Sequence, residues 1–150
     1  MNNKYMEYAL KIASEYFYLK EVPVAAVIVK DEKIIASGYN NIESSNNATL
    51  HAEILAINEA HYIGDLQSKY LTGADIYITL EPCLMCAGAL FLSRISNIYF
   101  GAYDYENGAF SKFEIEKKYN NPPNIYGGIM EEECSSLIKG FFKELRNGNK

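Results

Sequence analysis

Two short stretches decide what this chain can build. Residues 49–53 read Thr-Leu-His-Ala-Glu, and residues 79–86 read Thr-Leu-Glu-Pro-Cys-Leu-Met-Cys. If the two stretches meet in space, they offer one imidazole, two thiolates and one spare carboxylate, from His51, Cys83, Cys86 and Glu53. Three protein ligands with an open fourth position are typical of catalytic zinc sites, whereas structural zinc sites close that position with protein. The spare carboxylate is then the candidate proton carrier for a water bound to zinc.

The spacing of these residues predicts where two helices begin. Cys83 and Cys86 are three residues apart, about 300° on a helix, so both sulfurs can face one point. A helix N-terminus also favours thiolate over thiol. His51 and Glu53 are two residues apart, about 200°, and can share a site only if His51 lies at or before the first turn. We therefore expect a metal ion between two helix N-termini.

The chemistry that such a centre supports is hydrolysis by a zinc-activated water. Zinc brings the pKa of its water to about 7, so that a hydroxide is available to attack an electrophilic carbon. Glu53 takes a proton of the water and delivers it to the substrate, so that the leaving group can depart in protonated form.

Helix and strand patterns alternate along the chain. Apolar periodicity, β-branched runs and turn residues predict helices at 3–20, from His51, at 83–94 and at 131–147, and strands at 24–29, 34–39, 74–80, 98–101 and 125–130. The segment 103–124 is mixed and loop-rich. This order predicts an α/β fold, a three-layer α/β/α arrangement around a mixed sheet, with residues 1–150 as one domain.

Composition excludes several classes of protein. No apolar run approaches the length of about 20 residues that a membrane helix needs, so we expect no membrane association and a cytoplasmic protein. Three cysteines, two of them in one CxxC, argue against a disulfide scaffold. The net charge of −5 is unfavourable for nucleic-acid binding but does not exclude it, and 13 tyrosines and 7 phenylalanines are available to stack on bases.

The two stretches resemble the zinc motif of the cytidine-deaminase-like proteins, and the flanking sequence resembles the tRNA adenosine deaminases more closely still. The similarity extends from about Met6 to Arg146 and includes EVPVAAVIV, TLHAEILAI, YITLEPCLMCAGAL, YFGAYD and EECSSLIKGFF. The resemblance implies a cytidine-deaminase-like fold with a five-stranded mixed sheet, a homodimer, and conversion of adenosine to inosine at the wobble position of a tRNA anticodon stem-loop. It implies one Zn²⁺ per subunit, with a catalytic water in the fourth position.

Residue by residue, the resemblance assigns the zinc ligands to His51, Cys83 and Cys86 and the proton shuttle to Glu53. It assigns contacts with the substrate to three more residues: Asn40 to the flipped base, Asp104 near the nucleotide sugar, and Phe142 to the RNA site.

This chain departs from the family pattern at three places. Ala26 stands where glycine is common, Tyr103 stands where arginine is common, and the segment 104–108 lacks the usual lysine. The last two departures remove positive charge from the expected RNA face. Tyr103 or Tyr105 can compensate by stacking on a base.

Other interpretations stay open for several residues. Asn40 also suits a turn, Asp104 a solvated turn and Phe142 plain core packing, while Glu81 is interpreted as structural and His61 and Cys134 as uninvolved. The metal-ligand trio has an alternative as a buried histidine beside a redox CxxC. Two alternative functions also remain: a small-molecule deaminase of guanine, cytosine or a nucleoside, and a zinc-stabilised binding module without catalysis.

Overall fold

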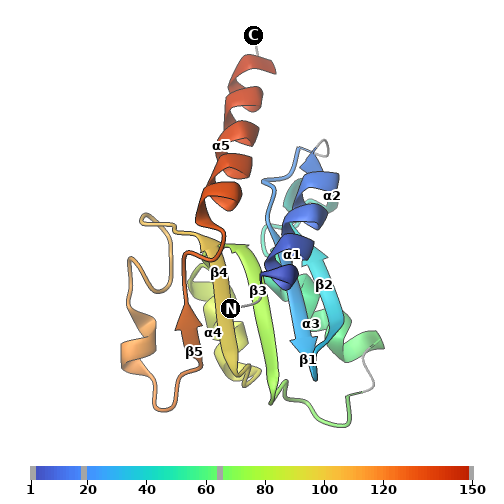
Figure 1. Ribbon diagram of the computed structural model, residues 1–150, viewed down its shortest axis with the longest axis vertical. Coiled ribbons are helices and arrows are strands. Elements are labelled where there is room, and N and C mark those ends of the chain that lie inside the picture. Colours follow the sequence, from blue (N-terminus) through green and yellow to red (C-terminus); the bar gives the residue numbers. More distant parts are fainter. Residues whose placement is uncertain (1–2, 18–19, 64–65, 149–150) are drawn as a thin grey trace.

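The computed structural model describes residues 3–17, 20–63 and 66–148. Its centre is one five-stranded sheet in the order β2-β1-β3-β4-β5 (Figure 1). The strands are β1 (Ala25–Lys30), β2 (Lys33–Tyr39), β3 (Ala74–Leu80), β4 (Asn97–Ala102) and β5 (Asn124–Tyr126). β1 is antiparallel to β2 and β3, whereas β3, β4 and β5 are parallel. The prediction of a mixed sheet is therefore confirmed.

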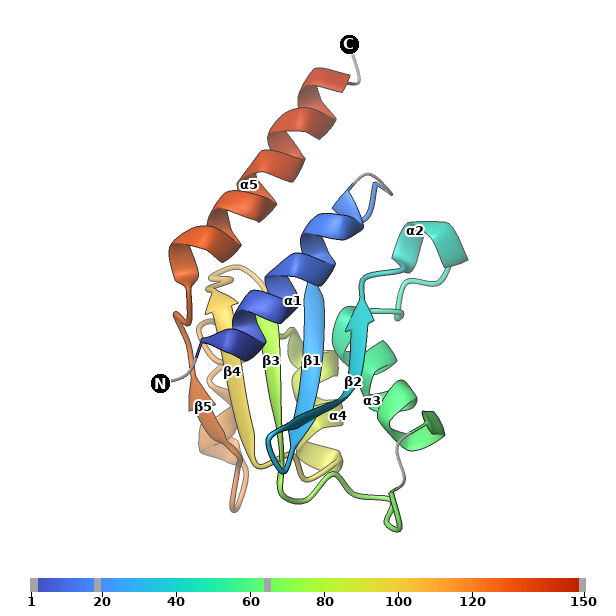
Figure 2. The same ribbon diagram turned by 45° about the vertical axis from the view of Figure 1, so that its right-hand side comes forward.

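Helices cover both faces of the sheet. The helical segments are α1 (Lys4–Glu15), α2 (Ile42–Ser45), α3 (Ala52–Ile63), α4 (Leu84–Leu92), η2 (Ile115–Lys118) and α5 (Glu131–Gly148). α3 and α4 pack on one face, while α1 and the first half of α5 pack on the other, and α5 then projects beyond the sheet (Figures 1 and 2). The predicted three-layer arrangement is confirmed. No helix in the described part of the chain is long and apolar enough to cross a membrane.

The sheet is apolar on both faces because each face has its own core. Along β1, Ala26 and Ile28 contact the core under α3 and α4, and Ala25, Val27 and Val29 contact the core under α1 and α5. Successive residues of a strand point to opposite faces, so a central strand covered twice is a continuous apolar run. This double burial explains why 24–29 shows no polar alternation.

The first helix is shorter than predicted. The expected span of 3–20 ends at Glu15, with Tyr16 as the C-cap, and residues 18–19 lie outside the described part of the chain. The ring of Tyr16 stacks on Tyr39 at a centroid distance of 3.7 Å. Lys20 then has a positive φ of 62°, which is incompatible with a continuing helix. The apolar stripe that extends past Glu15 therefore packs on other segments, with Tyr16 on the end of β2 and Phe17 against Phe141 of α5.

The last strand is also shorter than predicted. Instead of 125–130, β5 ends at Tyr126, because the two glycines that follow adapt the chain to neighbouring rings. A Cβ atom on Gly127 would lie 2.4 Å from the ring of Phe100, and Gly128 has a φ of +82°. The short segments α2 and η2 were not predicted, since one helical turn carries too little periodicity to detect. Gly64 and Asp65, which are predicted to end the helix that begins at His51, lie outside the described residues.

Candidate active site

The two helix starts lie where the spacing predicted them. His51 immediately precedes α3, and its carbonyl oxygen accepts the N–H of Leu55 at 3.1 Å. Cys83 is the N-cap of α4, and its carbonyl oxygen accepts the N–H of Ala87 at 2.9 Å. Pro82 comes directly before this cap, where no N–H is needed. The prediction that His51 opens its helix is therefore confirmed.

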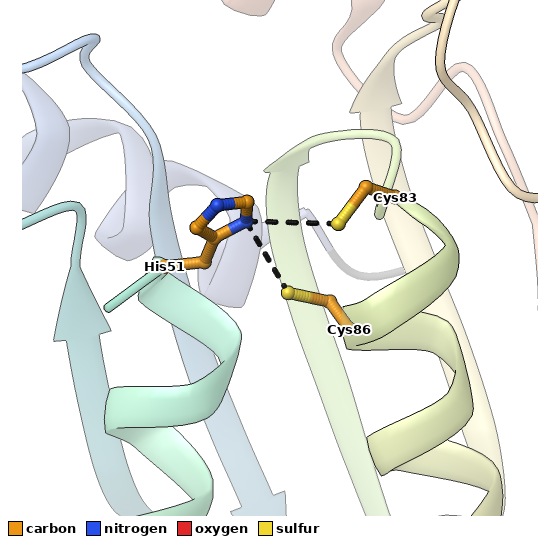
Figure 3. Close-up of side chains that lie close together, drawn as sticks. All are labelled: His51, Cys83 and Cys86. Atoms are coloured by element: carbon orange, nitrogen blue, oxygen red, sulfur yellow. Dashed lines mark hydrogen bonds between the residues drawn. The ribbon is translucent and has the colours of Figure 1, made fainter. Parts of the chain in front are cut away.

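The three predicted ligands converge between these helix N-termini (Figure 3). Nδ1 of His51 lies 3.6 Å from Sγ of Cys83 and 3.5 Å from Sγ of Cys86. Zn–N and Zn–S bonds of about 2.0 and 2.3 Å at a tetrahedral angle would separate nitrogen and sulfur by about 3.5 Å. The donor set fits zinc in chemistry and in spacing. Among the described residues, this is the only group of histidine, cysteine and acidic side chains that meets the geometry of a metal site.

A hydrogen bond between the two ligand cysteines shifts their pKa values in opposite directions. A hydrogen bond from the Cys86 thiol lowers the pKa of Cys83 to about 5, and the same hydrogen bond, followed by burial, raises the pKa of Cys86. The first thiolate is therefore available at neutral pH, and metal binding displaces the proton that remains on the second.

Glu53 is buried beside these ligands. Only 4% of it is exposed, and burial raises the pKa of its carboxyl group to about 7. Hydrogen bonding to its own backbone and to Cys86 opposes this rise, which places the carboxyl against the ligand set. A buried carboxyl group whose pKa lies near neutrality can both accept and donate a proton. The bound cation would lower this pKa, since an opposite charge favours the carboxylate.

Asn40 joins the site through the start of α3. Its Oδ1 accepts the N–H of Ala52 at 3.0 Å, and its own backbone N–H donates to the carbonyl oxygen of Val24 at 3.0 Å. The turn interpretation of this residue thus has a structural counterpart, a cap on the helix that carries His51 and Glu53. Because Oδ1 is used by the helix, the carboxamide nitrogen is the donor that remains for a ligand.

Phe142 is not a core residue. It is 40% exposed, whereas its neighbour Phe141 is buried and packs edge-on against Phe17. Asn40 and Phe142 line the same groove of about 450 Å³, whose wall also includes residues from α2 and the segment after α1. The groove places the predicted base contact and the predicted aromatic contact on one surface, although they are far apart in the sequence.

Asp104 lies on a different wall. Its Oδ1 accepts the N–H groups of Glu106 and Asn107 at 3.1 and 3.0 Å, so one carboxylate oxygen closes a local turn. Its backbone N–H donates to Oε1 of Glu81 at 3.2 Å. The turn interpretation therefore describes its local structure, and the second oxygen remains for a ligand. Asp104 is not part of the groove that Asn40 and Phe142 line.

Three further residues are predicted to take no part in catalysis. Glu81 is buried and holds the loop that carries Asp104, so the structural interpretation is right. His61 is exposed on α3, and Cys134 is buried against Gly101, both apart from the ligand trio. The hydrogen bonds of Ser111 to Glu81 were not predicted from the sequence. The only signal for that loop was the turn-forming Asn107-Gly108 pair.

Comparison with known proteins places these observations in a family. Residues 1–102 match the family described as the cytidine and deoxycytidylate deaminase zinc-binding region. The chain is 48% identical over 147 residues to the tRNA-specific adenosine deaminase of Rickettsia bellii, covering 95% of this chain and 100% of that protein. It is 40% identical over 149 residues to the tRNA-specific adenosine deaminase of Bacillus subtilis, covering 97% and 91% of the two chains.

A solved structure extends the comparison to three dimensions. A protein from work on A-to-I editing by tRNA:A34 deaminases at the wobble position of transfer RNA superposes with a TM-score of 0.83. It is 36% identical, and the alignment covers 91% of this chain and 99% of that one. The relatives match along nearly their whole length, so the similarity includes the segments outside the zinc motif. The chain belongs to the tRNA-specific adenosine deaminase family, within the zinc-binding cytidine deaminase fold.

Proposed function

We propose that this protein converts adenosine to inosine at the wobble position of a tRNA anticodon by zinc-dependent hydrolytic deamination. The observation that carries the proposal is the three-donor site with a buried Glu53 beside it, in a chain whose similarity to tRNA-specific adenosine deaminases covers 95% of its length. We place this chemistry in one domain of a cytoplasmic protein, as expected for an enzyme that acts on tRNA.

Each residue of the centre has a separate task in this reaction. His51, Cys83 and Cys86 would hold the zinc ion, which lowers the pKa of water to about 7 and so provides a nucleophile at neutral pH. Glu53 carries one proton of the attacking water to a ring nitrogen of adenine, and then carries the proton of the new hydroxyl group to the departing amine. The carbon–nitrogen bond breaks, a carbon–oxygen bond replaces it, and ammonia leaves.

The surroundings of the centre favour this proton transfer. Glu53 and Cys86 are buried, so bulk water does not compete for the proton. Both α3 and α4 begin beside the site (Figure 3). Their positive ends favour the negative charge that develops as the water attacks.

The substrate would approach across the groove and the loop around Asp104. A base must leave its stack to reach the centre, and the carboxamide nitrogen of Asn40 and the exposed ring of Phe142 offer a hydrogen bond and a stacking surface for RNA. Positive charge is available on α5, where Lys139, Lys143 and Arg146 recur at helical spacing. The exposed Tyr105 and the half-exposed Tyr103 offer further stacking surfaces where the usual arginine and lysine are missing.

A homodimer would cover an apolar surface that the monomer leaves open. The outer face of α4 exposes Leu84, Met85 and Leu92, the last of which is 77% exposed. Isolated exposed side chains are ordinary, but three on one helix over the metal ligands favour an interface. We therefore propose that α4 lies at the dimer interface. Light scattering on the wild type and on Leu92→Glu tests this proposal, which predicts a dimer that the charged variant converts to monomer.

A small-molecule deaminase of the same fold is the weaker alternative. The acidic net charge and the missing basic residues near Asp104 favour it, but the relatives that match along most of this chain are named for tRNA. The decisive assay incubates the purified protein with anticodon stem-loops and, separately, with free guanine, cytosine and nucleosides. Inosine in a stem-loop is the expected result. Ammonia release from a free base, with no inosine in any RNA, would overturn the proposal.

A further inference from the structure

Glu81 is a buried carboxylate that gathers one loop around itself. It is 3% exposed, and it accepts four hydrogen bonds from residues 104–111. Oε1 accepts the N–H of Asp104 at 3.2 Å and the hydroxyl of Ser111 at 2.5 Å. Oε2 accepts the N–H groups of Phe110 and Ser111 at 3.0 and 2.8 Å. All four partners are donors, which suits a carboxylate, because a carboxylate only accepts.

The same loop lies along the backbone of a metal ligand. Gly108 forms an isolated β-bridge with Cys83, and the N–H of Ala109 donates to the carbonyl oxygen of Pro82 at 2.9 Å. Glu81 itself is fixed to the sheet, since its N–H donates to the carbonyl oxygen of Ala102 at 2.8 Å. The carboxylate therefore holds the loop 104–111 against the turn that presents Cys83.

The contact is too close for a larger residue in the loop. A Cβ atom on Gly108 would lie 2.1 Å from Oε2 of Glu81 and 2.3 Å from the carbonyl oxygen of Asp104. Glycine at this position lets the loop backbone reach the carboxylate. The loop and the carboxylate thus fit each other as one unit, which the sequence separates by more than twenty residues.

We infer that Glu81 is a positioning residue for substrate binding. By holding both ends of the loop, at Asp104 and at Phe110–Ser111, it fixes the wall that faces the substrate relative to the metal centre. Its effect should appear in the binding of the RNA and not in the proton transfer, because Glu53 belongs to α3 on the other side of the centre. We call Glu81 and its four hydrogen bonds to residues 104–111 the clamp. The role in RNA binding rests on the proposed function, whereas the existence of the clamp does not.

The substitution Glu81→Gln tests the clamp selectively. One oxygen of the glutamine can still accept two N–H groups, but its NH₂ replaces the other acceptor, so at least one backbone N–H of the loop loses its partner. We expect amide hydrogen exchange in 104–111 to accelerate by about 10- to 100-fold, with the rest of the protein unchanged. With an anticodon stem-loop, we expect KM to rise about tenfold, kcat to change by less than about threefold, and one zinc per chain to be retained.

Glu59→Gln is the matched control. Oε2 of Glu59 accepts a single N–H, that of Ser37 at 2.6 Å, and a glutamine oxygen can replace it there. This variant should keep the wild-type exchange pattern and kinetics. Unchanged exchange in 104–111 of Glu81→Gln would overturn the clamp, and faster exchange with an unchanged KM would overturn its role in substrate binding.

A second variant keeps the test decisive if Glu81→Gln loses its zinc or does not fold. Ser111→Ala removes one hydrogen bond to the same carboxylate and leaves the three backbone bonds in place. It should raise loop exchange and KM by about two- to fivefold, and wild-type values for both would overturn the inference. If the wild type produces no inosine, the proposed function fails, and the exchange comparison alone decides the clamp.

Discussion

The metal centre and the substrate-facing rim of this protein are built in different ways. The centre takes its ligands from the first residues of two helices that pack side by side on one face of the sheet (Figures 2 and 3). The rim combines the end of β2, a loop after β4 and the projecting helix α5. Side-chain hydrogen bonds tie its first two parts to the elements of the centre: the N–H of Ala52 donates to Asn40, and the N–H of Asp104 donates to Glu81. We propose that the two helix starts carry the chemistry and that the rim binds the substrate.

This difference has a physical consequence for mutation. A ligand at a helix N-terminus is fixed by backbone hydrogen bonds, so removing its side chain should abolish metal binding without disturbing the helix. A residue of the rim often serves both its neighbours and the ligand, as Asn40 does with the N–H of Ala52. A substitution in the centre should therefore lower either the zinc content or the rate of proton transfer, but not both. A substitution in the rim should change the free energy of unfolding and the affinity for substrate together.

The largest expected effect is that of Cys86→Ala. The substitution removes a buried sulfur from the ligand trio, and two remaining ligands hold zinc poorly. We expect less than about a tenth of the wild-type zinc content and activity at background, measured by metal analysis and inosine formation. Cys134→Ala is the matched control, since Cys134 is equally buried but lies against Gly101. Full zinc content in Cys86→Ala would contradict the assigned ligand set.

Glu53→Gln should separate chemistry from metal binding. Glutamine keeps the size of the side chain but cannot carry the proton, so kcat should fall by about 10²- to 10⁴-fold. Zinc content should stay at one per chain, because the residue is not among the three convergent donors. The measurement is single-turnover inosine formation with the zinc content determined on the same sample. Wild-type kcat would remove Glu53 from the reaction.

The centre could be predicted from the sequence, and the rim only in part. The spacings of His51, Glu53, Cys83 and Cys86 have few geometric solutions on helices, so they locate both helix starts. The hydrogen bonds of Glu81 join distant segments through backbone N–H groups, which any residue type provides. No pattern of residues encodes such a contact.

The predicted ends of α1 and β5 are wrong for the same reason, which is contact between distant segments. Periodicity continues past Glu15, because Tyr16 uses its apolar ring to stack on Tyr39 instead of extending the helix. Likewise, β5 stops where Gly127 passes the ring of Phe100. In both places a contact between segments far apart in the sequence overrides the local pattern.

Asn40 can show whether capping and base recognition are distinct. Asn40→Asp keeps an oxygen for the N–H of Ala52 but removes the NH₂ donor, so stability should change by less than about 0.5 kcal/mol. The kcat/KM for a stem-loop should still fall by about 10- to 100-fold, through the lost donor and the added charge. Asn40→Ala should lose the cap as well, at about 1 kcal/mol of unfolding free energy.

Chemical denaturation and steady-state kinetics measure the free energy of unfolding and kcat/KM of Asn40→Asp and Asn40→Ala. If Asn40→Asp retained wild-type kcat/KM, the carboxamide nitrogen would have no part in substrate binding, and Asn40 would be a cap alone. If both variants lost the same stability, the hydrogen bond to Ala52 would not explain the placement of this residue.

The smallest expected effects on activity come from two glycines, one in the loop beside Glu81 and one inside α5. An alanine Cβ at Gly108 would meet Glu81 and the backbone of Asp104, so Gly108→Ala should displace the loop and cost about 1–3 kcal/mol of unfolding free energy. An alanine Cβ at Gly140 would meet nothing within 4 Å, and Gly140 lies inside α5. Gly140→Ala should therefore stabilise the protein by about 0.5–1 kcal/mol through helix propensity.

Urea unfolding of both variants at one protein concentration measures the contrast, since dimerisation would otherwise shift the midpoints. KM for a stem-loop should rise for Gly108→Ala and stay unchanged for Gly140→Ala, because only the first variant moves the wall beside Cys83. A neutral Gly108→Ala would mean that the loop has room to yield around Glu81. The loop would then tolerate a larger side chain as well as the exposed face of α5 does. Close packing of the loop against Cys83 and Glu81 would not be what fixes its conformation.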